Sequence, residues 1–172
     1  QKVEVEVIGN SGEQEKIRRL IVATKAYDAA EAVNSVKGRL DPAAEILCLC
    51  NGVGVGEDLM DRGLIDEKRI TFGLGSYGVY KMISSSREIK VRATPGGAIE
   101  IYGSIAKDFA QDIPLLRTDV LHSKEKFHIN QGLKLGVNSA INPITTLYNS
   151  RNGIIADKSN TPLQELIASL ST

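Results

Sequence analysis

The sequence predicts an α/β fold that gives way to helical structure towards the C-terminal end of the chain. Short apolar runs without alternation stand at residues 20–24 and 46–50, which is typical of strands that are covered on both faces. A segment with helical character at 27–37 separates these runs, so strand, helix and strand follow one another as in a parallel βαβ unit. From about residue 125 to 147 the pattern becomes strongly helical.

The elements of the first half follow from local signals. Residues 3–7 alternate between valine and glutamate, which predicts a half-buried strand of the kind found at sheet edges. Gly38 is expected to close the first helix as a C-terminal cap. A glycine-rich loop follows the second apolar run, and another helix is expected near 56–62.

Beyond residue 69 the pattern changes, and strands are expected at 70–79, 88–92 and 98–102. Serines at 84–86 and the Pro-Gly-Gly sequence at 95–97 mark the turns between them. A helix is expected over about 104–111, and a proline at 114 marks a break. We therefore divide the chain into an α/β domain, residues 1–115, and the beginning of a helical domain, residues 116–172.

Composition restricts the function classes. Lys plus Arg and Asp plus Glu both number 21 among the 172 residues, so no net charge attracts nucleic acid or an anionic membrane. No apolar run approaches the roughly 20 residues of a membrane span. His122 and His128 lack metal-site spacing, so no metal is expected. Cys48 and Cys50 would share one face of a strand as free thiols, which favours a reducing compartment. The cytoplasm is the default, and an organelle reached by a removed targeting segment is the alternative.

The most informative pattern is the recurrence of Lys134, Asn138 and Asn142 at every fourth position of the expected C-terminal helix. Such residues form one slightly slanted polar stripe. The rest of that helix is apolar, so we expect it to be buried, and Pro143 is expected to bend it. A buried polar stripe needs partners. It either lines a cleft for a small polar substrate, or its asparagines satisfy neighbouring backbone while the lysine reaches the surface.

Two further candidates follow the apolar runs. Asn51-Gly52 comes directly after the run at 46–50, and Lys25 follows the run at 20–24. In open parallel sheets, ligands bind beyond the carboxyl ends of the strands. The glycines are spaced GxGxG rather than GxGxxG, and no acidic residue ends the following strand, so this is a weak dinucleotide fingerprint. An ordinary turn, and a solvated lysine at a helix start, remain the alternatives.

Together, residues 23–27, 50–54 and 134–143, with the later Asn-Gly at 152–153, resemble the ketopantoate reductase (2-dehydropantoate 2-reductase) family. The resemblance implies the second half of a Rossmann-like sheet, followed by the beginning of an all-helical domain for substrate binding and dimerisation. It also implies the NADPH-dependent reduction of a 2-oxo acid, of the 2-dehydropantoate-to-pantoate type, in pantothenate biosynthesis. A homodimer, or association with the missing part of the fold, is expected.

The resemblance also implies a role for each matching residue. Lys134 matches the family's general acid, which protonates the alkoxide as hydride reaches the carbonyl. The residues implied in substrate binding are Asn138, Asn142 and Asn152, and those implied in NADP binding are Lys25, Asn51 and Gly52.

The chain departs from the family pattern at several points, one of which is Gln131-Gly132-Leu133 in place of the aromatic or basic residues that often precede the helix's lysine. No GxGxxG segment precedes Val22, Cys50 replaces the family's usual glutamine before Asn-Gly, and the chain ends before the later helices that bring a serine and an acidic residue to the site. Three hypotheses therefore remain: a part of a longer reductase, a non-catalytic ketopantoate-reductase-like binding module without cofactor binding, or an unrelated α/β domain whose Lys/Asn stripe is structural.

Overall fold

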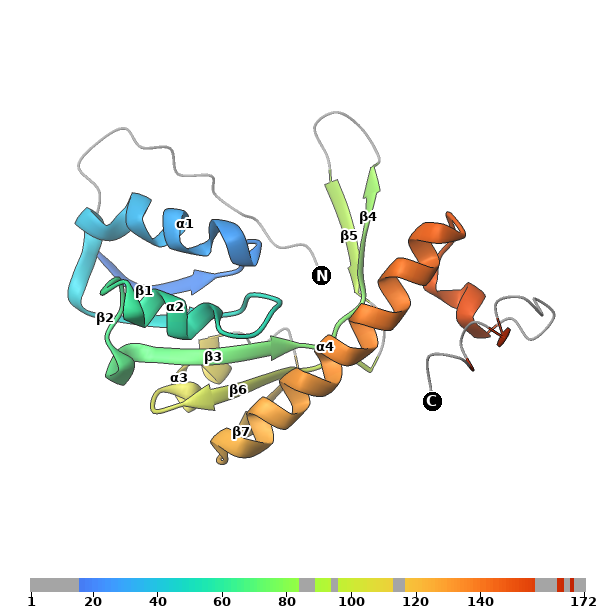
Figure 1. The fold of residues 1–172 in the computed structure, drawn as a ribbon. Helices are drawn as coiled ribbons and strands as arrows, with labels where there is room; N and C mark the ends of the chain where they lie inside the picture. Colours follow the sequence, from blue (N-terminus) through green and yellow to red (C-terminus); the bar gives the residue numbers. More distant parts are fainter. Residues whose placement is uncertain are drawn as a thin grey trace. The chain divides into compact units, whose positions relative to one another are not determined.

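The computed structural model describes residues 16–83, 89–93, 96–112, 117–156, 164–165 and 168. It divides into two compact units, Gln1–Val120 and Leu121–Thr172 (Figure 1). The strand expected at 3–7, the serine turn at 84–86 and the proline at 114 lie outside the described residues.

Within the described part of the first unit, five strands form the main sheet in the order β1-β2-β3-β6-β7. Their bounds are β1 Ile17–Val22, β2 Leu40–Cys48, β3 Ile70–Gly75, β6 Ile99–Gly103 and β7 Thr118–Leu121. β1, β2 and β3 are parallel neighbours, whereas β6 runs antiparallel to β3. The predicted βαβ arrangement is therefore confirmed.

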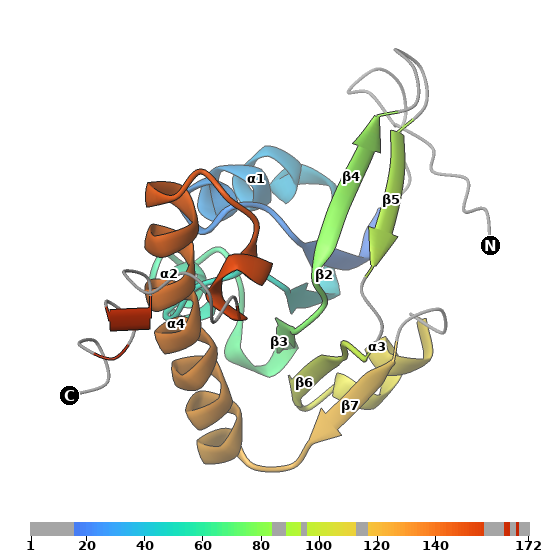
Figure 2. The same ribbon diagram turned by 90° about the vertical axis from the view of Figure 1, so that its right-hand side faces the viewer.

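Helices cover both faces of this sheet. The connection from β1 to β2 contains η1 (Ala26–Asp28), α1 (Ala29–Val36) and η2 (Lys37–Arg39). The connection from β2 to β3 contains α2 (Val55–Asp61) and η3 (Glu67–Arg69). On the other face, α3 (Ala106–Asp112) follows β6 and packs against it (Figure 2). The predicted C-cap at Gly38 is wrong: α1 ends at Val36, and Gly38 lies inside the η2 turn without a positive φ.

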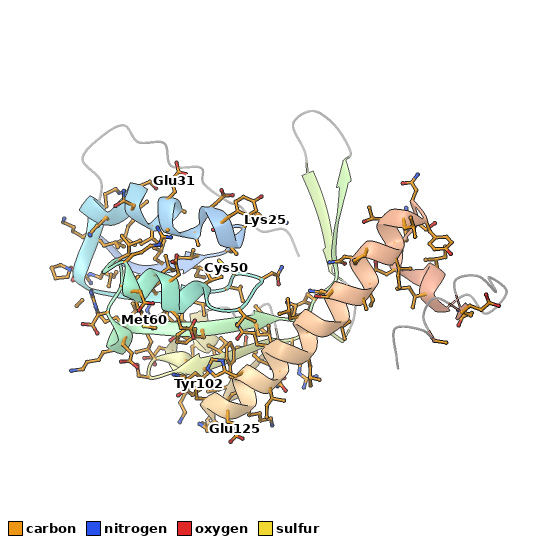
Figure 3. The ribbon with its side chains drawn as sticks, in the orientation of Figure 1. Lys25, Glu31, Cys50, Met60, Tyr102 and Glu125 are labelled. Carbon is orange, nitrogen blue, oxygen red and sulfur yellow. The ribbon has the colours of Figure 1, made fainter. Side chains whose placement is uncertain are left out.

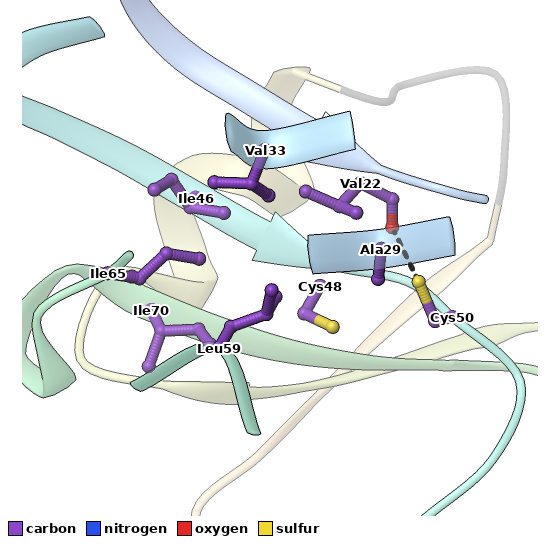
Figure 4. Close-up of a cluster of buried hydrophobic side chains, with 9 residues drawn as sticks. All are labelled: Val22, Ala29, Val33, Ile46, Cys48, Cys50, Leu59, Ile65 and Ile70. Atoms are coloured by element: carbon purple, nitrogen blue, oxygen red, sulfur yellow. Dashed lines mark hydrogen bonds between the residues drawn. The ribbon is translucent and has the colours of Figure 1, made fainter. Parts of the chain in front are cut away.

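The apolar core is split by the sheet into two clusters, because successive side chains of a strand point to opposite faces. The α1/α2 face holds a cluster of nine buried residues: Val22, Ala29, Val33, Ile46, Cys48, Cys50, Leu59, Ile65 and Ile70 (Figure 4). The α3 face holds Leu47, Ile99, Ile101, Ala106 and Phe109. This double covering explains why the strand at 46–48 is continuously apolar.

The strand expected at 70–79 is interrupted. β3 ends at Gly75, and β4 (Val79–Ile83) pairs instead with β5 (Ile89–Ala93) in a separate antiparallel hairpin. At the break, the Ser76 backbone N–H donates to the Ala98 carbonyl at 2.8 Å, and its hydroxyl oxygen accepts from the Ala98 N–H at 2.9 Å. These bonds hold the end of β3 against the beginning of β6.

The second unit contains α4 (Lys124–Leu147) and η4 (Asn152–Ala156), which packs against it. Ser123 caps α4 by accepting a hydrogen bond from the Lys126 backbone N–H. The helix expected at 125–147 is confirmed, and it continues through Pro143. No helix among the described residues combines the length and apolar character needed to cross a membrane.

The expected burial of this helix is wrong for this chain. Phe127 and Ile144 are buried, but the Leu133, Val137 and Leu147 side chains are 65%, 54% and 75% exposed. Apolar residues on most sides of a helix indicate surface that is suited to burial, but they do not supply the element that covers it. Among the described elements of the second unit, only η4 packs against α4.

Candidate active site

The first group of candidate residues lies at the carboxyl edge of the parallel strands. Val22 at the end of β1 is paired with Cys48 at the end of β2, so the loops that follow both strands leave the sheet at the same level. The first loop carries Lys25 and the second carries Asn51 and Gly52. Figure 3 shows Lys25 and Cys50 at this end of the strands. The sequence prediction that both loops meet at one edge is therefore confirmed.

Direct contacts join the two loops. The Leu49 backbone N–H donates to the Val22 carbonyl at 2.8 Å, and the Cys50 thiol donates to the same carbonyl at 3.4 Å. The Thr24 hydroxyl lies 4.0 Å from the Cys50 sulfur. A Cβ on Gly52 would lie 3.6 Å from the Ala26 Cβ. The residues on either side of Lys25 and Asn51 are therefore in contact.

The Lys25 and Asn51 side chains are exposed at this edge. Lys25 has extended backbone angles, φ −66° and ψ 149°, and stands at the N-terminal boundary of the η1 turn. A lysine in this position offers a point charge to a phosphate or carboxylate, and an asparagine offers both a donor and an acceptor. The edge therefore presents polar groups suited to a ligand.

The glycines of the second loop have structural explanations of their own. Gly52 has φ 124°, and Gly54 has φ 82° at the N-cap of α2, which are conformations that glycine adopts without strain. A Cβ on Gly56 would lie 2.3 Å from the Phe72 ring. The GxGxG pattern thus follows from turn geometry and from the close approach of α2 to β3, and it is not evidence of a phosphate loop.

The second group lies on α4, where the four-residue spacing places Lys134, Asn138 and Asn142 along one slanted face. Lys134 and Asn138 are half-buried and Asn142 is exposed. Burial of the Lys134 ammonium lowers its pKa below the ordinary lysine value, since removal from water disfavours the charged form. The stripe therefore combines a partly desolvated ammonium with two amides.

Threonine side chains support the same segment of α4. The Asn142 carbonyl accepts from the Thr145 hydroxyl at 3.1 Å and from the Thr146 hydroxyl at 2.8 Å. Both hydroxyls therefore donate to the carbonyl that directly precedes Pro143, whereas the backbone N–H that Pro143 lacks would have bonded the Ser139 carbonyl one turn earlier. Asn152, the remaining candidate, is exposed at the first position of η4.

The structure thus brings Lys25, Asn51 and Gly52 together in the first unit. Lys134, Asn138, Asn142 and Asn152 belong to the second unit. Among the described residues, no three His, Cys, Asp or Glu side chains gather as metal ligands.

Sequence reasoning missed the contact between Thr24 and Cys50. Both residues lie inside the motifs that carry the family resemblance, but the sequence indicates for Cys50 only a free thiol that replaces the family's usual glutamine. The available signal was position, because each residue directly precedes a candidate ligand-binding residue. Both cysteines are free and buried. Burial, reinforced by neighbouring Cys50, raises the pKa of the Cys48 thiol to about 12.

Three parallel strands joined by crossover helices, with polar loops at their carboxyl edge, define a Rossmann-like α/β fold. The family model described as "Ketopantoate reductase PanE/ApbA" matches residues 1–101. The chain belongs to this family.

Proteins of known sequence and of known structure are similar to this chain. The chain is 30% identical over 139 residues to the 2-dehydropantoate 2-reductase of Yersinia pestis, which covers 78% of the chain and 43% of the relative. Its fold is similar to that of a D-mandelate dehydrogenase solved with NADH (TM-score 0.70, 18% identity, 90% of this chain and 51% of that one). It is also similar to a dimeric ketopantoate reductase from Staphylococcus aureus (TM-score 0.57, 15% identity, 84% and 51%). The chain therefore spans about half the length of these relatives.

Proposed function

We propose that this chain is part of a reductase that uses NADPH to convert a 2-oxo acid of the 2-dehydropantoate type into its 2-hydroxy acid, as in pantothenate biosynthesis. The observation that carries the proposal is Lys134, a half-buried ammonium with a lowered pKa, which stands one helical turn from the Asn138 amide. Family membership and the name of the Yersinia pestis relative support the same reaction.

The carboxyl edge of the sheet would hold the cofactor. Lys25 offers a cation for phosphate, and Asn51 with the backbone of Gly52 offers amide groups, so the chemistry of this donor set fits a nicotinamide dinucleotide. When bound, the cofactor supplies hydride. The chain's own residues bind it and orient it.

Lys134 would supply the proton. Negative charge builds on the carbonyl oxygen of a 2-oxo acid during reduction, and a fixed ammonium stabilises that charge before it delivers the proton. A lowered pKa brings an ammonium closer to the range in which proton donation near neutral pH is efficient. Asn138, Asn142 and Asn152 would hydrogen-bond the carboxylate and the hydroxyl groups of the substrate.

The test follows nicotinamide absorbance in the reductase that contains this chain, with NADPH and 2-dehydropantoate as substrates. Replacing Lys134 by alanine is expected to lower kcat by about 100-fold or more. Lys126→Ala, which removes an exposed ammonium from the same helix, is the matched control and should leave the rate within about twofold.

Each outcome separates the hypotheses. An unchanged kcat in Lys134→Ala would remove this lysine as the acid. If the intact protein neither oxidises NADPH nor binds it, the chain is a non-catalytic module of the family.

The same proposal includes the setting of the reaction. Two buried free thiols suit a reducing compartment, and we place the enzyme in the cytoplasm. We expect a homodimer, the state stated for the Staphylococcus aureus ketopantoate reductase.

A further inference from the structure

Cys50 occupies a structural position that neither the family assignment nor the proposed reaction explains. It is the last residue of the apolar run at 46–50 and directly precedes Asn51. Its side chain is buried, with 7% exposed. The thiol donates to the Val22 carbonyl at 3.4 Å, as Figure 4 shows. Cys50 therefore extends the pairing of β1 with β2 beyond Val22 and Cys48, where the ladder ends.

The same thiol also reaches the first loop. The Thr24 hydroxyl lies 4.0 Å from the Cys50 sulfur, a separation suited to a weak hydrogen bond that involves sulfur. Thr24 directly precedes Lys25. On the other side of Cys50, Gly52 lies against Ala26. One buried side chain thus links the backbone before Asn51 to the backbone before Lys25.

We propose that Cys50 is a positioning residue that holds Asn51 and Gly52 against the loop of Lys25 and so sets the affinity for the dinucleotide. This inference rests on the proposed function. Cys50 lies beneath the exposed edge, so it acts through its neighbours and not by touching the ligand. A fixed loop binds more tightly because less conformational freedom is lost on binding.

Cys48 provides a matched control within the same cluster. It is also a buried thiol, with 5% exposed, and it packs in the same apolar core two residues earlier. It lies within β2 and interacts with Cys50, but the contacts with the Val22 carbonyl and the Thr24 hydroxyl belong to Cys50, so loss of the Cys48 thiol should lower stability without releasing Asn51. A comparison of Cys50→Ala with Cys48→Ala therefore separates positioning from general packing.

The experiment measures the NADPH dissociation constant of the full-length protein by nicotinamide fluorescence, with thermal unfolding to verify that each variant is folded. Cys50→Ala is expected to weaken NADPH binding about 3- to 10-fold, the effect of one lost hydrogen bond, with kcat at saturating NADPH within about twofold. Cys50→Ser keeps a donor and should recover most of the affinity. Cys48→Ala should bind as the unmodified protein does.

A second readout needs no cofactor. Amide hydrogen exchange of residues 51–54 in the unliganded protein should accelerate in Cys50→Ala and stay unchanged in Cys48→Ala. Equal effects of the two variants on affinity and exchange would overturn the positioning role and leave the proposed function standing. Absence of NADPH binding by the unmodified protein would instead defeat the proposed function, while the exchange measurement would still report on the link between the loops.

Discussion

Replacing Gly56 by alanine should destabilise the chain, because α2 approaches β3 too closely for any side chain at this position. An alanine Cβ would lie 2.3 Å from Cε1 and 2.9 Å from Cδ1 of Phe72, and 3.2 Å from Cδ1 of Ile70. Carbon atoms in contact normally lie about 3.5–4.0 Å apart. The Phe72 ring or the helix must therefore move by about 1 Å or more to relieve the overlap.

The magnitude follows from two opposing effects. Overpacking by one methyl group costs about 1–3 kcal/mol. Alanine is better than glycine in a helix by up to about 1 kcal/mol, which offsets part of that cost. Phe72 is half-buried, so its ring has some room to yield. The net loss expected is about 1–2 kcal/mol in the free energy of unfolding.

Urea denaturation followed by circular dichroism measures this loss. Gly38→Ala is the control, because no atom lies within 4 Å of its added Cβ and its φ is not positive. The control should be unchanged or stabilised by up to about 1 kcal/mol. Equal stability of the two variants would refute the packing explanation and reopen the possibility that a ligand requires glycine in this loop.

Two further predictions concern the core. Phe109 is 1% exposed in the cluster on the α3 face, so Phe109→Ala should lower the free energy of unfolding by about 3–5 kcal/mol. Leu133→Ala should change it by less than about 0.5 kcal/mol. Similar urea midpoints for the two variants would contradict the burial of Phe109. The raised pKa of Cys48 means that the folded chain holds the thiol proton more tightly than the unfolded chain does. The contribution of this thiol to the free energy of unfolding is therefore complete below pH 9.0 and is lost as the pH rises towards 12. The decline should be smaller in Cys48→Ala, and parallel stability curves for the two proteins would count against the raised pKa.

β2 and β3 could be located from the sequence because burial on both faces leaves an unbroken apolar run, whereas β1 is less covered, with Ile21 46% exposed. The start of β3 at Ile70 was predicted correctly, but the starts of β1 and β2 were not. β2 begins at Leu40 and not near 46, and its first residues include Asp41 and Pro42. The pairing with β1 shifts register between Ile17 and Arg19, where the strand is irregular. A proline is tolerated at such an irregular position, so Pro42 does not end the strand.

β7 (Thr118–Leu121) was missed for a different reason. It has four residues, all half-buried, and its sequence Thr-Asp-Val-Leu shows neither alternation nor an unbroken apolar run. It lies at the end of the sheet order, and the Ile99 backbone N–H donates to the Arg117 carbonyl just before it. Pairing with a neighbour that is distant in sequence defines this strand, and no local pattern records that pairing.

The bounds of α4 could be predicted closely, since helical periodicity runs through nearly all of its twenty-four residues, and Ser123, a typical N-cap residue, directly precedes them. The environment of α4 could not be predicted from the sequence. The apolar pattern is compatible with burial on most sides, yet which sides are covered depends on other elements. Lys134 is half-buried while Leu133 beside it is exposed, so the helix is covered on one side and open on the next.

The loop glycines and Lys134 differ in how strongly they indicate a function. Gly52, Gly54 and Gly56 have reasons to be glycine that involve no ligand, so the loop pattern carries little weight for or against cofactor binding. Lys134 is different, because partial burial of an ammonium costs stability and helix formation does not require it. A lysine that only supported the helix would be replaceable by methionine without loss of activity. Replacement of a proton donor by methionine would lower the activity, so the rates of the Lys134 variants test the proposed chemistry independently of the glycines.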